Sequence, residues 1–146
     1  KKKFDLILIK QTIHLLQLND IKNLLIQIKK SLKPNGRVFI ITLNPRKNEL
    51  PTFFLMRRKL LKSLKRDKKI LSFISKLYPN RILKIFNYKV KIDRQKYVHM
   101  ISKRFISTLL NLSNKQILSG IKEISLKYKK KLKFNDKLVC IIIKNN

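Results

Sequence analysis

The chain has 146 residues, of which 37 are Lys or Arg and 7 are Asp or Glu, so its formal net charge is +30. Its 44% hydrophobic content excludes a disordered basic tail, because such tails lack the apolar surface that offsets chain entropy. The single cysteine excludes an internal disulfide, and no apolar run nears the roughly 18 residues of a membrane-spanning helix. The sequence also lacks a signal-peptide pattern, so we expect a cytoplasmic protein without a membrane segment.

The first element predicted is a strand at residues 4–9, a nearly continuous apolar run that is typical of a strand buried on both faces. A helix follows, and Asn19 or Asp20 is expected to cap it. Its apolar stripe consists of Ile21, Leu24, Leu25, Ile28 and Leu32.

The sequence Lys-Pro-Asn-Gly at residues 33–36 predicts a turn that ends this helix, because proline cannot continue a helix. Residues 37–42 form a second apolar run and are predicted to be another buried strand. A strand, a helix and a strand with a tight return make a βαβ unit, so the two strands should be parallel.

After a polar loop at residues 44–51, the pattern predicts two helices, at residues 52–64 and 68–77. Residues 87–92 alternate between apolar residues and lysine, which indicates an edge strand. Asp93 can cap the next helix, whose apolar residues are Tyr97, Met100, Ile101 and Phe105.

Ser113 and Gln116 have the spacing of a capping box, which predicts the start of the last helix. Its apolar residues are Ile117, Leu118, Ile121, Ile124 and Tyr128. We expect a turn at residues 134–137 and a final buried strand at residues 138–144. No internal repeat or linker is visible, which favours one domain.

Two stretches resemble the carboxyl-terminal half of a class I S-adenosylmethionine-dependent methyltransferase. Residues 4–16, Phe-Asp-Leu-Ile-Leu-Ile-Lys-Gln-Thr-Ile-His-Leu-Leu, are similar to the fourth strand and following turn of that family. Residues 24–42 are similar to its next helix, its Leu-Lys-Pro-Gly-Gly turn and its fifth strand. Here Asn35 replaces the first glycine, which a turn tolerates because Asn also accepts positive φ.

The resemblance implies an α/β fold: a partial Rossmann-like methyltransferase sheet with flanking helices. It would contain the last four strands, with the final strand antiparallel between the fifth and sixth. The family's Gly-rich loop and the acidic residue that ends its second strand are not found among these residues. We therefore expect residues 1–146 to be the carboxyl-terminal half of a single methyltransferase domain, with the amino-terminal cofactor-binding half absent. Alone, this half should aggregate and should not bind cofactor measurably.

The resemblance implies that Lys10, Gln11 and Thr12 contact S-adenosylmethionine, because ligands of open α/β sheets lie at the carboxyl ends of strands. The alternative is that they are ordinary loop residues. No catalytic residue is assigned. The sulfonium methyl group is already activated, so the enzyme mainly aligns the acceptor and excludes water.

Three further residues are candidates for binding the methyl acceptor, which the resemblance implies is a small molecule. His14 follows the first strand, Asn44 follows the second, and Arg104 could bind an anionic group. Each has a structural alternative, since a lone histidine more often packs or caps. Two distant histidines and one cysteine make no metal site.

A different function class is a basic RNA-binding or ribonucleoprotein-associated module, and a third is an interaction domain without catalysis. An RNA-binding module would expose aromatic side chains beside lysines and arginines, but most aromatics here fall in apolar stripes. The chain has 29 Lys, 21 Ile and 12 Asn but no Ala, a composition typical of AT-rich codons, and only 8 basic residues are Arg. We therefore attribute the charge more to codon bias than to a nucleic-acid surface.

Overall fold

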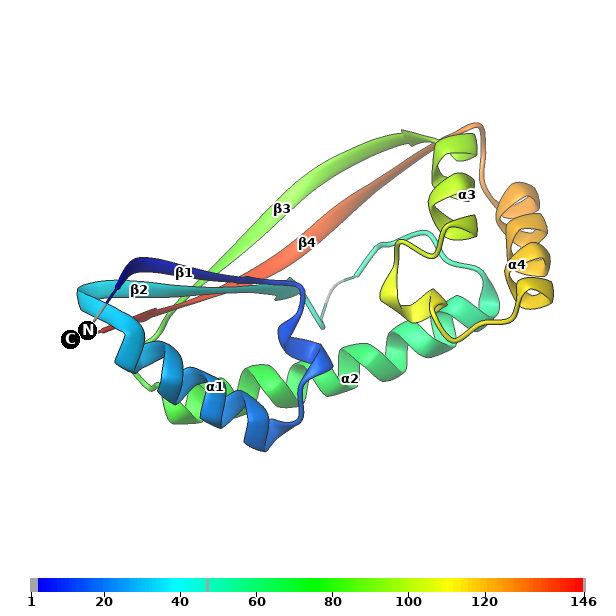
Figure 1. The fold of residues 1–146 in the computed structure, drawn as a ribbon. Helices are drawn as coiled ribbons and strands as arrows, with labels where there is room; N and C mark the ends of the chain where they lie inside the picture. The colour runs from blue at the N-terminus through cyan, green and yellow to red at the C-terminus, as the bar shows by residue number, and fades with distance from the viewer. Residues whose placement is uncertain (1–2, 47, 146) are drawn as a thin grey trace. The chain divides into compact units, whose positions relative to one another are not determined.

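The computed structural model describes residues 3–46 and 48–145, which form a mixed α/β fold with a four-stranded sheet and four α-helices (Figure 1). The predicted order of strands and helices is confirmed. The elements are β1 (Phe4–Lys10), η1 (Ile13–Leu15), α1 (Leu18–Ser31), β2 (Leu32–Leu43), α2 (Phe54–Leu77), β3 (Ile82–Asp93), α3 (Arg94–Ser102), η2 (Ser107–Leu109), α4 (Asn114–Lys127) and β4 (Lys131–Lys144), where η marks a 3-10 helix.

The chain divides into two compact units. The first contains residues 1–47, 65–86 and 137–146, and the second contains residues 48–64 and 87–136. Each unit has its own cluster of buried apolar side chains. The single-domain organisation stays a prediction.

The strands of the sheet lie in the order β1-β2-β4-β3. β1 is parallel to β2, in a register that pairs Leu6 with Arg37 and Lys10 with Ile41. β4 is antiparallel to β2, and Ile40 pairs with Ile141. The last strand of the chain therefore lies between β2 and β3 and runs antiparallel to β2, as predicted. β1 and β3 are the edge strands, as expected for residues 87–92 of β3.

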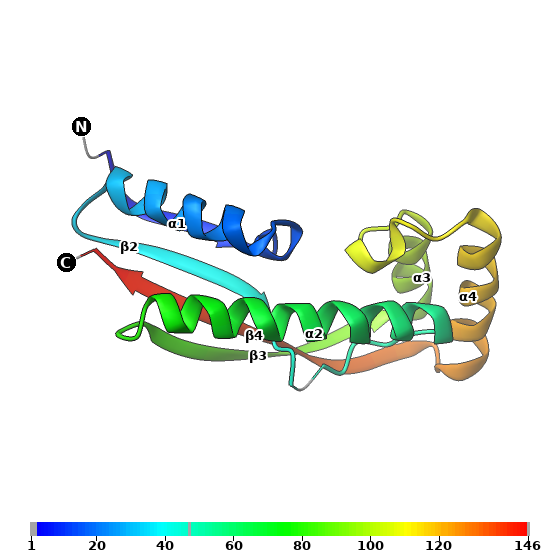
Figure 2. The same ribbon diagram turned by 90° about the horizontal axis from the view of Figure 1, so that it is seen from below.

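One face of this sheet is packed in the first unit. Helix α1 lies against the β1–β2 pair, as Figure 2 shows from below. Ile21 and Leu25 of α1 pack with Val38 and Ile40 of β2, since the stripe on the helix matches the alternation on the strand. Ile70, on the part of α2 that belongs to this unit, joins the same core.

The prediction that β1 is buried on both faces is wrong. Phe4, Leu6 and Leu8 are 48%, 52% and 55% exposed, whereas Ile7 and Ile9 pack against the core. The two sets alternate along the strand, so they lie on opposite faces. Helices cover only the face that carries Ile7 and Ile9.

Two predictions at the ends of α1 are wrong. The helix begins at Leu18, with Gln17 at the N-cap and no side-chain cap bond, so neither Asn19 nor Asp20 caps it. Leu32 belongs to β2, which also includes the predicted turn at residues 33–36. Asn35 does have a positive φ, 62°, as expected of the residue that replaces glycine.

Other predicted boundaries are also corrected. Residues 54–77 form one helix, α2, rather than two, because the polar residues between the two predicted helices continue the helical backbone. β3 begins at Ile82, five residues earlier than predicted, and β4 runs through the predicted turn at residues 134–137. Asp93 is the N-cap of α3 but makes no side-chain cap bond, and Phe105 lies beyond that helix and is exposed.

The second unit is built around α4 and aromatic side chains. Ser113 and Gln116 form the predicted capping box. Gly120 allows α4 to approach Phe53, because a Cβ at this glycine would lie 2.6 Å from the phenyl ring. Tyr97 is buried and donates a hydrogen bond to the carbonyl of Pro51.

Candidate functional site

The carboxyl end of β1 carries the three residues predicted to bind the cofactor. Lys10 is the last residue of the strand, and Gln11 and Thr12 follow it with exposed side chains. Gln11 has a φ of 52°, and its N–H donates to the carbonyl of Ile41 at 2.8 Å. The chain therefore leaves the sheet through a left-handed residue and presents an ammonium, an amide and a hydroxyl group at the strand end. Their role in binding stays a prediction.

His14 lies in η1, the short helical turn that follows this strand end. The neighbouring Ile13 is buried in the core of the first unit and anchors the turn, while His14 is half-buried. The N–H of Leu15 donates to the carbonyl of Thr12 at 2.9 Å, which closes the turn. His14 is thus held close in sequence and in space to the exposed groups at the end of β1.

Asn44 lies at the carboxyl end of β2 and is buried. Its Oδ1 accepts a hydrogen bond from the N–H of Arg46 at 3.0 Å, and its own N–H donates to the carbonyl of Lys137 at 2.8 Å. These bonds shape the loop that leaves β2. Because β1 and β2 are parallel neighbours, Asn44 and the end of β1 share one edge of the sheet.

Asp67 belongs to the same unit and was not predicted. It is 4% exposed, and its Oδ1 is buried without a hydrogen-bond partner. Burial raises the pKa of its carboxyl group above the ordinary 3.8, and the charges of His14 and Arg66 oppose this rise. Asp67 therefore lies within electrostatic reach of His14, at the site that the sequence predicted.

A sequence signal for Asp67 existed. It continues the buried stripe of α2, at helical spacing from Leu64, Ile70 and Ile74. It was hidden because residues 65–67 were predicted to lie between two helices. A carboxyl group on an apolar stripe is a polar group in a core position, and such positions are often functional.

Arg66 connects α2 to the segment that follows η1. Its Nη2 donates to the carbonyl of Leu16 at 3.0 Å. Two consecutive residues of α2, Arg66 and Asp67, thus interact with the segment between β1 and α1.

Arg104 lies in the second unit, far along the sequence from the other candidate residues. It has a φ of 53°, and its Nη2 donates to the carbonyl of Leu112 at 3.1 Å and to Oδ1 of Asn114 at 2.7 Å. These contacts tie the loop after α3 to the start of α4. The predicted role in substrate binding stays untested, and the observed contacts are structural.

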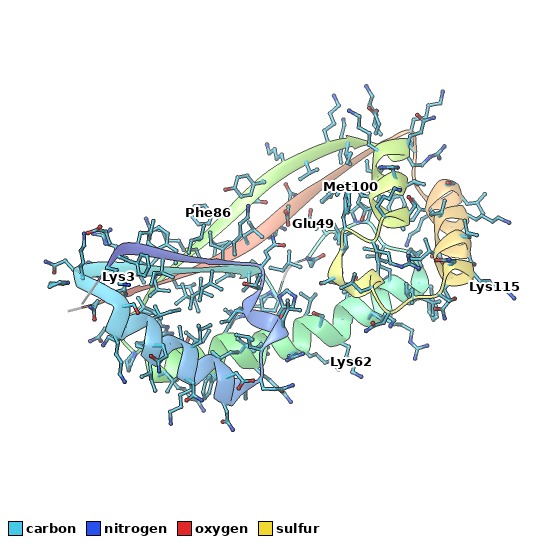
Figure 3. The ribbon with its side chains drawn as sticks, in the orientation of Figure 1. Lys3, Glu49, Lys62, Phe86, Met100 and Lys115 are labelled. Atoms are coloured by element: carbon cyan, nitrogen blue, oxygen red, sulfur yellow. The ribbon has the colours of Figure 1, made fainter. Side chains whose placement is uncertain are left out.

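The second unit contains a groove of about 380 Å³ between β3 and β4. Its lining includes an aromatic ring, three lysines, an amide and a carboxylate: Phe134, Lys89, Lys91, Lys133, Asn135 and Glu49. Glu49, labelled in Figure 3, accepts hydrogen bonds from the backbone N–H and the Nδ2 of Asn135 at 3.1 and 2.8 Å. Lysines around a ring favour an anionic ligand with a flat group.

Other titratable groups offer less chemistry. Burial raises the pKa of the Cys140 thiol, so it is a weak nucleophile, although the charge of Lys84 opposes the rise. Within residues 3–46 and 48–145, no three histidine, cysteine or acidic side chains gather where they could hold a metal ion. In the same residues, no helix has the length and apolar character needed to cross a membrane.

No protein-family model and no curated protein matches this sequence. Among solved structures, a "putative methyltransferase" from Bacillus halodurans aligns with a TM-score of 0.49 and 11% sequence identity. The alignment covers 99% of this chain and 65% of that one, so this chain spans 65% of the length of that structure.

Proposed function

We propose that the full-length protein transfers a methyl group from S-adenosylmethionine to a small-molecule acceptor. The observation that carries the proposal is the sheet order β1-β2-β4-β3, with β4 antiparallel to β2. The order agrees with the last four strands implied by the sequence resemblance, and residues 4–16 and 24–42, which carry that resemblance, contain β1 and most of β2. On this reading, residues 1–146 are the carboxyl-terminal half of a single methyltransferase domain.

The residues at the end of β1 fit one part of the cofactor, its amino-acid end. That end has a carboxylate, which can accept hydrogen bonds from the Lys10 ammonium and the Thr12 hydroxyl. It also has an amino group, whose N–H groups can donate a hydrogen bond to the side-chain carbonyl oxygen of Gln11. Bound cofactor supplies an activated methyl group. The chain's own part is then to hold the acceptor in line and exclude water, for which His14 and Asn44 lie at the same sheet edge.

The proposal is tested by calorimetric binding of S-adenosylhomocysteine to the full-length protein. We expect Gln11→Ala to weaken binding about tenfold, which corresponds to ~1.4 kcal/mol. Gln95→Ala is the matched control, because Gln95 is an exposed glutamine on α3. The proposal fails if the full-length protein binds no cofactor product, or if the two variants bind it equally.

A second candidate function, binding of RNA, is favoured by the groove in the second unit. Lys89, Lys91 and Lys133 line this groove together with Phe134. Tyr88, next to Lys89 on β3, is 54% exposed, although it is not among the residues that line the groove. The expectation that aromatics fall mostly in buried stripes therefore does not hold for this strand. Exposed rings beside lysines are what single-stranded RNA requires.

RNA binding is tested by the salt dependence of affinity for a single-stranded oligonucleotide. Replacing Lys89, Lys91 and Lys133 with Gln should make the slope of log affinity against log salt less steep. The change should be equivalent to losing about two to three phosphate contacts. The control replaces Lys62, Lys96 and Lys115, which are exposed. Lys62 and Lys115 point away from the ribbon in Figure 3. Equal slopes in the two triple variants would exclude the groove as an RNA site.

A further inference from the structure

The groove between β3 and β4 is not used by the proposed methyl transfer. Its volume of about 380 Å³ lies within the range of roughly 300–1,000 Å³ that is typical of small-molecule sites. All of its lining residues belong to the second unit, whereas the residues that follow β1 and β2 belong to the first. The groove is therefore a separate candidate site for a small molecule.

The charge of the lining selects an anion. Lys89, Lys91 and Lys133, the groove lysines, face one carboxylate, that of Glu49, so the lining has an excess of two positive charges. Oε2 of Glu49 already accepts two hydrogen bonds from Asn135, at 3.1 and 2.8 Å. Ammonium groups only donate hydrogen bonds, so their ligand must accept them. A phosphate monoester carries a charge of about −1.5 to −2 near pH 7, which matches this excess.

The lining also contains one aromatic ring, that of Phe134. This ring makes an edge contact with the ring of Tyr97, with centroids 6.4 Å apart and planes at 61°. Tyr97 is buried and donates a hydrogen bond to the carbonyl of Pro51, so it is fixed in the core of the second unit. The contact holds the Phe134 ring in place, and a ring held in place is a platform on which a planar group can stack.

We propose that this groove binds a nucleoside monophosphate, with its base against the Phe134 ring and its phosphate among the groove lysines. A single strand of RNA has the same chemistry in each nucleotide, but it needs several rings on which successive bases stack. The lining supplies one ring, and the exposed Tyr88 lies outside it. The groove therefore suits one free nucleotide better than a strand. This inference goes beyond the proposed methyl transfer and does not depend on it.

The site is tested by calorimetric titration of the full-length protein with adenosine 5′-monophosphate at low salt. Replacing all three groove lysines with Gln should weaken binding about tenfold or more, because three charge pairs with the phosphate are lost. The matched control replaces Lys96, Lys115 and Lys122 with Gln, which are exposed lysines on helices of the same unit. Absence of binding, or equal affinity in the two triple variants, would overturn the proposal.

The role of the ring is tested by Phe134→Leu. This variant should bind adenosine 5′-monophosphate about fivefold or more weakly, because the base loses its stacking partner. Its affinity for ribose 5-phosphate, which has no base, should not change. A groove that failed to fold would lose affinity for both ligands, so the second ligand separates stacking from folding. Unchanged affinity for the nucleotide, or equal losses for the two ligands, would contradict the assigned ring contact.

The sign of the charge is tested by Glu49→Gln. The amide removes a negative charge from the lining but keeps a side-chain oxygen that can accept hydrogen bonds from Asn135. Binding of adenosine 5′-monophosphate should therefore become about twofold or more tighter. Weaker or unchanged binding would contradict an anionic ligand in the groove.

A single-stranded oligonucleotide distinguishes the free nucleotide from a nucleotide within RNA. Binding of the oligonucleotide without binding of adenosine 5′-monophosphate would overturn the inference and would leave RNA as the ligand. Binding of the mononucleotide that depends on the groove lysines would support the inference, even in a protein that does not bind S-adenosylhomocysteine. The outcome for this groove is thus separate from the outcome for methyl transfer.

Discussion

Asp67 in the first unit and two glutamates in the second differ in how their carboxylate oxygens are hydrogen-bonded. In the second unit, Glu123 accepts the N–H of Phe54 with both carboxylate oxygens, at 2.9 and 3.0 Å, and Glu49 accepts two bonds from Asn135. In the first unit, Asp67 is buried with an oxygen that accepts none. A carboxylate that satisfies backbone donors stabilises its unit, whereas an unpaired one lowers stability and is free to act on a neighbour.

The cores also differ in kind. The first unit packs β-strands against helices through aliphatic side chains, mostly isoleucine and leucine. The second packs helices around Phe53, Met56 and Tyr97, with Gly120 allowing close contact. Aromatic rings have fixed shapes, so the second core should tolerate added volume less well.

The largest expected loss of stability comes from the same side-chain truncation made in each of the two cores. Ile40→Ala in the first unit and Ile101→Ala in the second should each lower the free energy of unfolding by about 2–5 kcal/mol, because both side chains are fully buried. Denaturant titration measures this. Leu126→Ala is the control, since Leu126 is 89% exposed and should change stability by about 0.5 kcal/mol or less. An isoleucine variant as stable as the control would contradict the assigned core.

The next effect sharpens the contrast in packing. Gly120→Ala should lower the free energy of unfolding by about 1–3 kcal/mol, because the new Cβ would lie 2.6 Å from the buried ring of Phe53. Ser119→Ala, at the exposed neighbouring position of α4, should be neutral or slightly stabilising. If Gly120→Ala is as stable as Ser119→Ala in thermal unfolding, the ring can move aside and the contact is not tight.

A smaller effect tests the satisfied carboxylate. Glu123→Ala should destabilise the protein by about 1 kcal/mol, because the N–H of Phe54 at the start of α2 loses its charged acceptor. Lys122→Ala removes an exposed neighbour on α4 and should have little effect. Chemical denaturation of both variants decides the matter, and equal stabilities would show that water replaces the carboxylate without loss.

The smallest effect has the opposite sign. Asp67→Asn should raise the free energy of unfolding at neutral pH by about 1 kcal/mol or less, because it removes a buried charge. The folded-state pKa of Asp67 is raised, so the stability linked to its protonation is fully present below about pH 3.8 and is lost as pH rises through the folded pKa. The gain should therefore disappear in acid.

Thermal unfolding from acidic to neutral pH measures this gain. Asp20→Asn, at an exposed site, should show no such pH dependence. A loss of stability in Asp67→Asn at neutral pH would mean that the carboxylate is structural, which would break the contrast between the two units.

Much of the local structure could be predicted from the sequence. The apolar run at residues 4–9, the stripe of α1 and the Ser113–Gln116 capping box all depend on neighbouring residues, so their patterns are visible without a fold. The position of β4 followed from family resemblance rather than from any local pattern. The ends of elements were less predictable, because strands β3 and β4 extend into polar segments wherever a partner strand supplies hydrogen bonds.

The candidate site divides in the same way. The sequence by itself determined that Lys10, Gln11, Thr12 and His14 follow a strand, because the change from apolar to polar residues marks its end. Only the tertiary structure buried Asp67 in the core, where the charge of His14 affects the pKa of its carboxyl group, since α2 had to be one continuous helix for this. Proximity between residues 53 positions apart is a property of packing, and no local pattern encodes it.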